Sequence, residues 1–181
     1  LVASNATSTN GFFSNLVATL ANITNLVVGN STTTNAVTTY LTANTSTVGT
    51  STVTGNATIG GTLGVTGTST LATTSATNLT VSGQTTLNTA SATALSATNA
   101  YLTTASTTNL TAVNATSTNL VTTNSTSTNS FISSLVATLA NITNLIVGNS
   151  TTTNATIVNA STTNLVASNA TSTNGFFSNL V

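Results

Sequence analysis

A five-residue repeat that runs through residues 116–180 decides the fold. From Thr116 the chain reads TSTNL VTTNS TSTNS FISSL VATLA NITNL IVGNS TTTNA TIVNA STTNL VASNA TSTNG FFSNL. Asn occupies the fourth place of most pentads, and Leu, Ala, Ser or Gly occupies the fifth. Residues five apart lie on different faces of an α-helix, so this period forms no apolar stripe there, whereas it suits short strands that end in corners and stack. The five-residue repeat therefore predicts an all-β, elongated parallel β-solenoid.

The sequence also contains repeats longer than five residues. Residues 1–17 recur identically at 165–181, and a closely similar copy of 1–36 begins at Leu120. The interval from Leu1 to Leu165 is called the long repeat below. Units of a solenoid interact mainly with their neighbours, so equal local sequence is expected to give equal local structure. We therefore expect residues 1–17 and 165–181 to adopt one conformation in equivalent environments, within a window of a longer repetitive protein.

The middle of the chain changes its period from five residues to eight. The leucines that mark this period are Leu63, Leu71, Leu79, Leu87 and Leu95, and each has a partner two residues later: Val65, Thr73, Val81, Thr89 and Ala97. An i, i+2 pair has strand periodicity, with both side chains on one face. Gly60, Gly61, Gly64, Gly67 and Gly83 gather here and indicate turns or bulges. The sequence predicts one continuous solenoid in three segments, 1–49, 50–95 and 96–181.

The composition excludes most kinds of chemistry. Of 181 residues, 99 are Thr, Ser or Asn, and none is Asp, Glu, Lys, Arg, His, Cys, Met, Trp or Pro. General acid–base catalysis and metal binding depend on side chains from that absent set, and nucleic-acid binding depends on Lys and Arg. We therefore expect no enzyme, no cofactor, no metal and no nucleic-acid partner. No apolar run approaches the length of a membrane helix, which takes about 20 residues.

The pentads STTNL, NITNL and TSTNL resemble the pentapeptide-repeat family over about 1–50 and 95–181. The resemblance implies a right-handed, four-sided β-helix with four pentads per coil, in which Leu and a small residue point inward. Such a coil would divide the long repeat into about eight coils and about 40 Å of fibre at the spacing of stacked strands. The middle resembles the Gly/Thr/Val repeats of bacterial surface proteins and phage fibre shafts. The whole composition is similar to Asn/Thr/Ser-rich surface proteins of bacteria.

The repeats predict a set of core residues and one surface feature. The predicted core consists of the recurring leucines, which are Leu1, Leu16, Leu26, Leu63, Leu71, Leu79, Leu87, Leu95, Leu110, Leu120, Leu135, Leu145, Leu165 and Leu180. Phenylalanines recur at equivalent places of the longer repeats: Phe12, Phe13, Phe131, Phe176 and Phe177. These rings form either a patch for lateral association or part of a wide core.

A neutral, repetitive β-chain is suited to a structural role. Charged residues normally protect strand edges against pairing with another chain, and this chain has none. We expect the shaft of an extracellular filament, stalk or fibre at the cell surface that self-associates.

Two alternatives remain open from the sequence. One is an adhesin or phage-type fibre that binds a host surface, with a regular face of Thr and Asn that recognises glycans or ice. The shift of the threonine spacing from five residues to eight counts against a match between such a face and a lattice. The other is an alternative architecture, a trimeric fibre of three intertwined chains.

Overall fold

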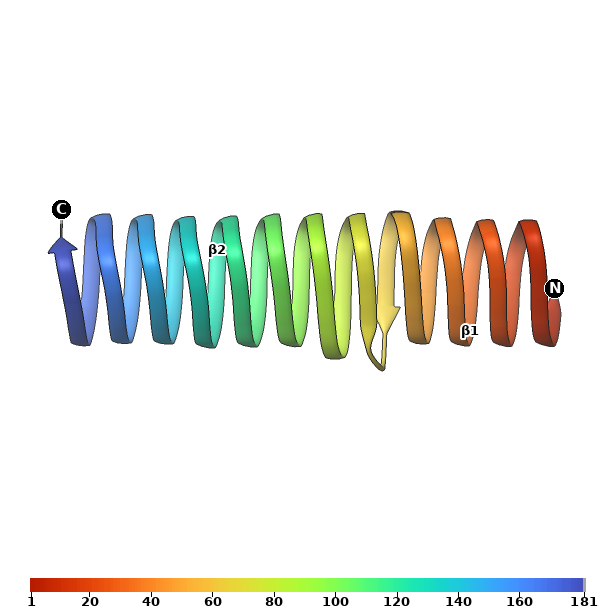
Figure 1. Cartoon of the computed structure of the whole chain (residues 1–181), viewed down its shortest axis with the longest axis horizontal. Helices are drawn as coiled ribbons and strands as arrows, with labels where there is room; N and C mark the ends of the chain where they lie inside the picture. The colour runs from red at the N-terminus through yellow and green to blue at the C-terminus, as the bar shows by residue number, and fades with distance from the viewer. Residues whose placement is uncertain (181) are drawn as a thin grey trace.

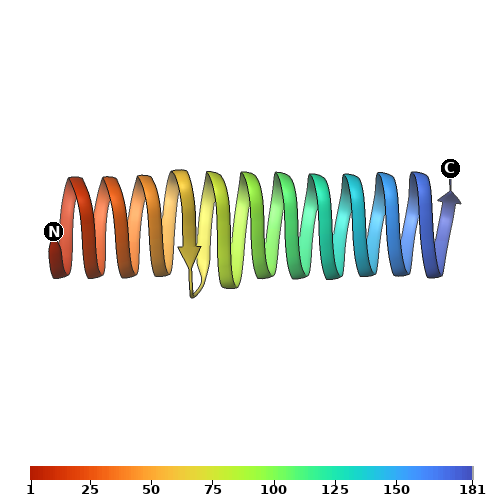
Figure 2. The same ribbon diagram turned by 180° about the vertical axis from the view of Figure 1, so that it is seen from behind.

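The protein is one long winding of parallel β-structure. A computed structural model describes the backbone of residues 1–180, and the side chains of all but 177 and 179–181. It consists of β1 (Val2–Val65) and β2 (Ser69–Leu180), which pair in parallel. The ribbon coils about one straight axis and the two termini lie at opposite ends (Figures 1 and 2). The predicted all-β, elongated parallel solenoid is therefore confirmed, and a single chain supplies its own core.

One coil of the regular part takes three pentads. The side-chain amide of Asn25 donates to Asn10 at 2.7 Å, and that of Asn144 donates to Asn129 at the same distance; both pairs are 15 residues apart. Three pentads therefore complete a turn, and the four pentads per coil implied by the family resemblance are wrong. The estimates of about eight coils and about 40 Å, which depended on that coil size, are wrong as well.

The burial pattern explains the small coil. Each regular pentad turns two side chains inward, its Leu-type residue and the residue two places later, and exposes the other three. One coil thus encloses six inward side chains: Leu16, Ala18, Ala21, Ile23, Leu26 and Val28. Because many inward positions hold Ala, Ser or Thr, a fourth pentad would enclose more volume than these side chains could fill at the normal packing density.

Every coil has three pentad sides, and their residues stack from coil to coil. Side A contains segments 2–4 and 17–19, side B contains 7–9 and 22–24, and side C contains 12–14 and 27–29; the first and third residues of each segment face outward, and the middle residue faces inward in the regular coils. Inward positions also form columns along the axis. Leu16, for example, lies in the column that starts at Leu1, because β-pairing places each coil directly on the one before it. The core is therefore a stack of thin layers.

Four sides in the middle of the chain hold a sixth residue. Ser51 pairs with Ser69, Ala57 with Thr74, and Leu63 with Leu79, so the pairing distance along the chain falls from eighteen to seventeen to sixteen positions. The register shifts lie between these pairs. Each longer side contains glycine. At Gly67 a Cβ atom would lie 2.2 Å from the carbonyl oxygen of Gly49, so only glycine allows this close approach of the coils.

The eight-residue period is two leucines per 16-residue coil. Leu63 and Leu79 occupy the first inward position of a side, and their partners Val65 and Val81 are buried as predicted. The pairing predicted for Leu71 and Leu87 is wrong, because Thr73 and Thr89 are exposed. Leu71 and Leu87 occupy the second inward position instead, so their inward partners come two residues earlier, at Ser69 and Thr85.

The long repeat is out of phase with the coil. Val2 lies on side A, whereas its sequence-identical counterpart Val166 lies on side C, in the column that contains Thr58 and Thr151. The prediction of equivalent environments is therefore wrong, although both segments are strand. Four positions of the long repeat are the extra ones on the longer sides, and the others make 32 pentads, which is ten coils and two sides. Successive repeats are thus rotated by one side.

One layer of the core is polar. Four consecutive inward positions carry hydroxyl groups, on Thr122, Ser125, Ser127 and Ser130, and all four side chains are buried. The hydroxyl oxygens of Ser127 and Ser130 are 2.5 Å apart and share a hydrogen bond, whereas the Ser125 hydroxyl has no partner among the described residues. A buried hydroxyl without a partner loses its hydrogen bonds to water and forms none in the protein, which costs free energy.

Ser125→Ala is therefore expected to stabilise the solenoid, by about 1 kcal/mol, because it removes an unpaired buried polar group. The matched control is Ser127→Ala in the same layer, which leaves the Ser130 hydroxyl without its partner and is expected to destabilise by a similar amount. Chemical denaturation of the two variants provides the measurement. If Ser125→Ala is the destabilising variant, the hydroxyl is bound to an internal water molecule and the layer is hydrated.

Candidate functional site

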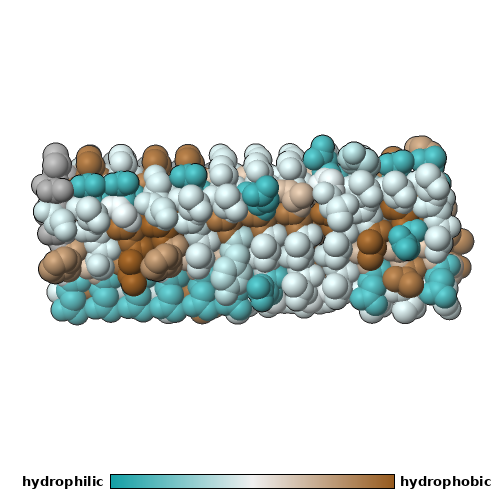
Figure 3. Space-filling view, in the orientation of Figure 1, coloured by the Kyte–Doolittle hydropathy of each residue, from teal (hydrophilic) through white to brown (hydrophobic). Residues whose placement is uncertain are grey.

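Ladders of asparagine run along the outside of the solenoid. The longest joins Asn99, Asn114, Asn129, Asn144, Asn159 and Asn174. Each residue after Asn99 donates its Nδ2–H to the Oδ1 of the ladder residue one coil earlier, at 2.6–2.9 Å. Shorter ladders link further pairs, such as Asn109 with Asn124 and Asn154 with Asn169. Hydrophilic residues gather in a continuous row over the C-terminal half of the face in Figure 3.

The ladders occupy the fourth pentad place, immediately before the inward turn of the chain. An amide carries both donors and acceptors, so a column of identical amides can satisfy itself indefinitely. Each neutral hydrogen bond of this kind contributes about 1 kcal/mol. The ladders therefore tie neighbouring coils together and fix their register, and they leave fewer free polar atoms for a ligand.

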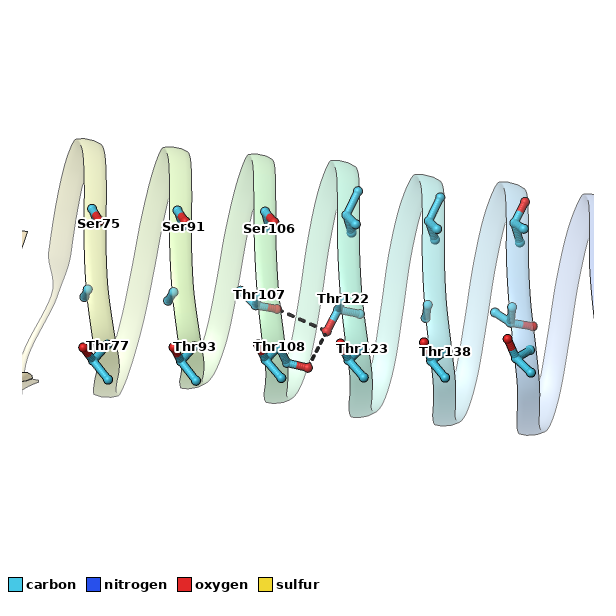
Figure 4. Close-up of a pocket in the computed structure, with 18 of the residues that line it drawn as sticks. Ser75, Thr77, Ser91, Thr93, Ser106, Thr107, Thr108, Thr122, Thr123 and Thr138 are labelled. Carbon is cyan, nitrogen blue, oxygen red and sulfur yellow. Dashed lines mark hydrogen bonds between the residues drawn. The ribbon is translucent and has the colours of Figure 1, made fainter.

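Side C presents a different surface, in which hydroxyl groups face solvent. The column at its third pentad place holds threonine in six successive coils, at Thr77, Thr93, Thr108, Thr123, Thr138 and Thr153. The parallel column two residues earlier holds Ser75, Ser91, Ser106, Val121, Val136 and Thr151. An open groove runs between the two columns, and Figure 4 shows the labelled threonines of the third column in one line with their side chains turned the same way.

The two other sides lack such a continuous column. On side A the corresponding places include Val113 and Val158, and the Thr98 hydroxyl there donates to the carbonyl of Ser82 at 2.8 Å. On side B, Gly148 interrupts the column and the neighbouring column carries Tyr101. Side C is therefore chemically distinct, although all three sides arise from the same pentad.

The predicted core residues are mostly buried. Twelve of the fourteen leucines lie in the core with 2% or less of their surface exposed: Leu16, Leu26, Leu63, Leu71, Leu79, Leu87, Leu95, Leu110, Leu120, Leu135, Leu145 and Leu165. Leu1, in the first turn of the described structure, is the exception, since 55% of its surface is exposed. The side chain of Leu180 lies outside the described residues.

The phenylalanines do not form one patch. Phe12 lies on side C near the N-terminus, and Phe131 and Phe176 lie on side B, three coils apart from each other. All three rings are exposed, whereas Phe13 packs partly against the core. The side chain of Phe177 lies outside the described residues. Figure 3 likewise shows apolar residues in separate patches on the visible face.

The described residues contain no group of His, Cys, Asp or Glu that could hold a metal, as the composition requires. Nor does the described part of the chain contain a helix suited to crossing a membrane. The polar chemistry of this surface is therefore that of hydroxyl and amide groups, which donate and accept hydrogen bonds without carrying charge.

No protein-family model, curated protein or solved structure matches this chain. Besides the coil size, the choice of the second inward residue differs from what the pentapeptide-repeat resemblance implies. The resemblance implies that the small residue two places before Leu points inward, but Thr24 is exposed. The buried residue is instead Val28, two places after Leu26. The functional argument therefore rests on the surface itself.

The hydroxyl surface of side C could not be located from the sequence. The signal that could have revealed it is the threonine spacing, which is sixteen positions from Thr77 to Thr93 and fifteen from each later threonine of the column to the next. The change of period from five residues to eight counted against a regular threonine face. It did so because the coil length that brings these threonines together was unknown.

Proposed function

We propose that the chain forms a segment of the shaft of an extracellular filament, stalk or fibre, and that it has no catalytic role. The observation that carries the proposal is the uniform stack of coils along one straight axis (Figure 1). Neighbouring coils pair in parallel through their backbones, and the asparagine ladders add side-chain hydrogen bonds between them. A stack of this kind can be lengthened by further coils without a change in its cross-section.

Neutral sides support the same proposal. Coils of a second copy can approach without electrostatic repulsion, since the chain has no charged side chain. Unpaired backbone donors and acceptors of a coil are a template for strand pairing. Stacking of one copy on another would extend both the backbone pairing and the inward columns.

The test is negative-stain electron microscopy of the chain and of two variants. The unaltered chain is expected to form uniform threads. Ala170→Lys places a charge in the inward column that contains the buried Ala155 and is expected to leave discrete particles, because a coil stacked on it would bury an unpaired ammonium at a high cost. Thr171→Lys adds the same charge to the adjacent exposed position and is expected to keep the threads. Discrete particles of the unaltered chain would refute the self-stacking shaft.

A second candidate function is an adhesin or phage-type fibre that binds glycans. It is favoured by the exposed rings of Tyr101 and Phe131, which lie two coils apart on side B beside a groove. Flat aromatic faces can stack on sugar rings, and the Tyr hydroxyl can bond to sugar hydroxyls. Discrete particles that bind a neutral glycan, and lose it on Phe131→Ser, would favour this function over the shaft.

A further inference from the structure

From the side C surface we propose that the solenoid binds the surface of ice. The hydroxyl array consists of the threonine column Thr77–Thr153 and the parallel Ser/Val/Thr column Ser75–Thr151, both exposed on every coil. The argument is independent of the filament proposal, since a single chain carries the whole array.

The first step is periodicity. Stacked strands are about 4.8 Å apart, and residues two places apart along a strand are separated by about 6.7 Å, so the array repeats in two directions. Six threonines in successive coils extend it over about 24 Å. The change from 16-residue to 15-residue coils does not interrupt it, because the extra residue within this stretch, on the side that contains Gly83, lies on side A. Such an array matches a periodic solid better than an irregular partner.

The second step is the state of the hydroxyl groups. Thr77 donates to the carbonyl of Gly60, but the hydroxyls of Thr93, Thr123, Thr138 and Thr153 have no hydrogen-bond partner among the described residues. Each can therefore donate one hydrogen bond and accept two from outside. The asparagine ladders are the opposite case, since their amides bond to one another.

The third step is the match of charge between the two surfaces. Ice presents uncharged donors and acceptors in a fixed lattice, and side C presents uncharged hydroxyls in a fixed lattice. No charged side chain is present to hold a mobile hydration shell or counterions. Val121 and Val136 are exposed in the parallel column beside the threonines, whose methyl groups are also apolar. Adsorption removes this apolar surface from water, which is favourable.

The array is rigid before it binds. Backbone pairing on both sides of each coil holds the columns in place, and β-branched side chains have few rotamers to lose. Many weak contacts that form together give strong adsorption, and one obstruction that prevents simultaneous engagement removes most of it. The decisive variant is therefore one that disrupts the array without touching the core.

The experiment measures thermal hysteresis and ice recrystallisation with the 181-residue chain. Thr123→Tyr raises a bulky ring from the centre of the array, and activity is expected to fall by about tenfold or more because adsorption depends on simultaneous contacts. The matched control is Thr118→Tyr, which makes the same change at the equivalent exposed place on side B of the same coil. It is expected to leave activity unchanged.

Circular dichroism melts establish that both variants remain folded. No ice activity in the unaltered chain would overturn the proposal, and so would equal loss in the two tyrosine variants. Binding of a neutral glycan by side C in the absence of ice activity would also overturn it, in favour of a polymer ligand. Loss of threads without loss of ice activity would refute the shaft alone, so the two proposals fail separately.

Discussion

Replacement of Leu26 by Asn is expected to destabilise the solenoid far more than replacement of the neighbouring Asn25 by Ser. Leu26 is 2% exposed, in the same coil layer as Ile23 and Val28. The change removes a buried apolar side chain, which costs about 2–5 kcal/mol, and it buries an amide with no partner. A total of roughly 4 kcal/mol or more is a large share of the stability of an ordinary domain.

Asn25→Ser affects only the outside of the same coil. The amide of Asn25 donates to Oδ1 of Asn10 at 2.7 Å, and its loss is expected to cost on the order of 1 kcal/mol. Denaturation midpoints and amide hydrogen exchange of residues 16–30 compare the two variants. Comparable effects of the two changes would contradict the assignment of the fifth pentad place to the core. A solenoid can open locally, so exchange identifies which coils are lost.

The inside and outside of the pentad could be predicted to a large extent from residue type. Leu at the fifth place and Asn before it are read directly from the sequence, because a large apolar residue gains by burial and stacked amides bond to each other. The second inward place was missed. It holds Ile23 in one coil, Thr33 in the next and Val48 in a third, so its residues vary in polarity and give no single pattern.

The coil size could not be predicted, because it is a property of three-dimensional closure rather than of the repeat unit. Three pentads and four pentads have the same sequence period, and only the packing of the inward side chains distinguishes them. The same gap concealed the threonine column of side C and the phase of the long repeat. Both depend on how many residues separate a side chain from the one beneath it.

Two long repeats in tandem are expected to be related by a rotation of one third of a turn. Ten coils and two sides separate Leu1 from Leu165, so the second copy begins one side out of step with the first. The threonine column would therefore lie on side C in one copy and on a different side in the next. Three repeats would restore the starting side after 32 coils, which is about 150 Å at the spacing of stacked strands.

The four additional residues of the middle segment do not alter this relation. A repeat of 32 pentads without them would have the same rotation, because the sides that contain Gly55, Gly61, Gly67 and Gly83 add length without adding a side. The phase is therefore determined by the number of sides, and insertion of one pentad at the junction of two copies completes the eleventh coil. That insertion supplies a matched control of nearly the same composition.

A tandem chain with Thr123→Cys in each copy, labelled with gold and imaged by cryo-electron microscopy, measures the rotation. The two labels are expected on different sides of the fibre, one third of a turn apart. In the control with one extra pentad they are expected on the same side. Labels on one side in the first chain would contradict the coil count, because they would require a whole number of coils per repeat. A fibre built this way presents the threonine column on each of its three sides in turn, one side per long repeat.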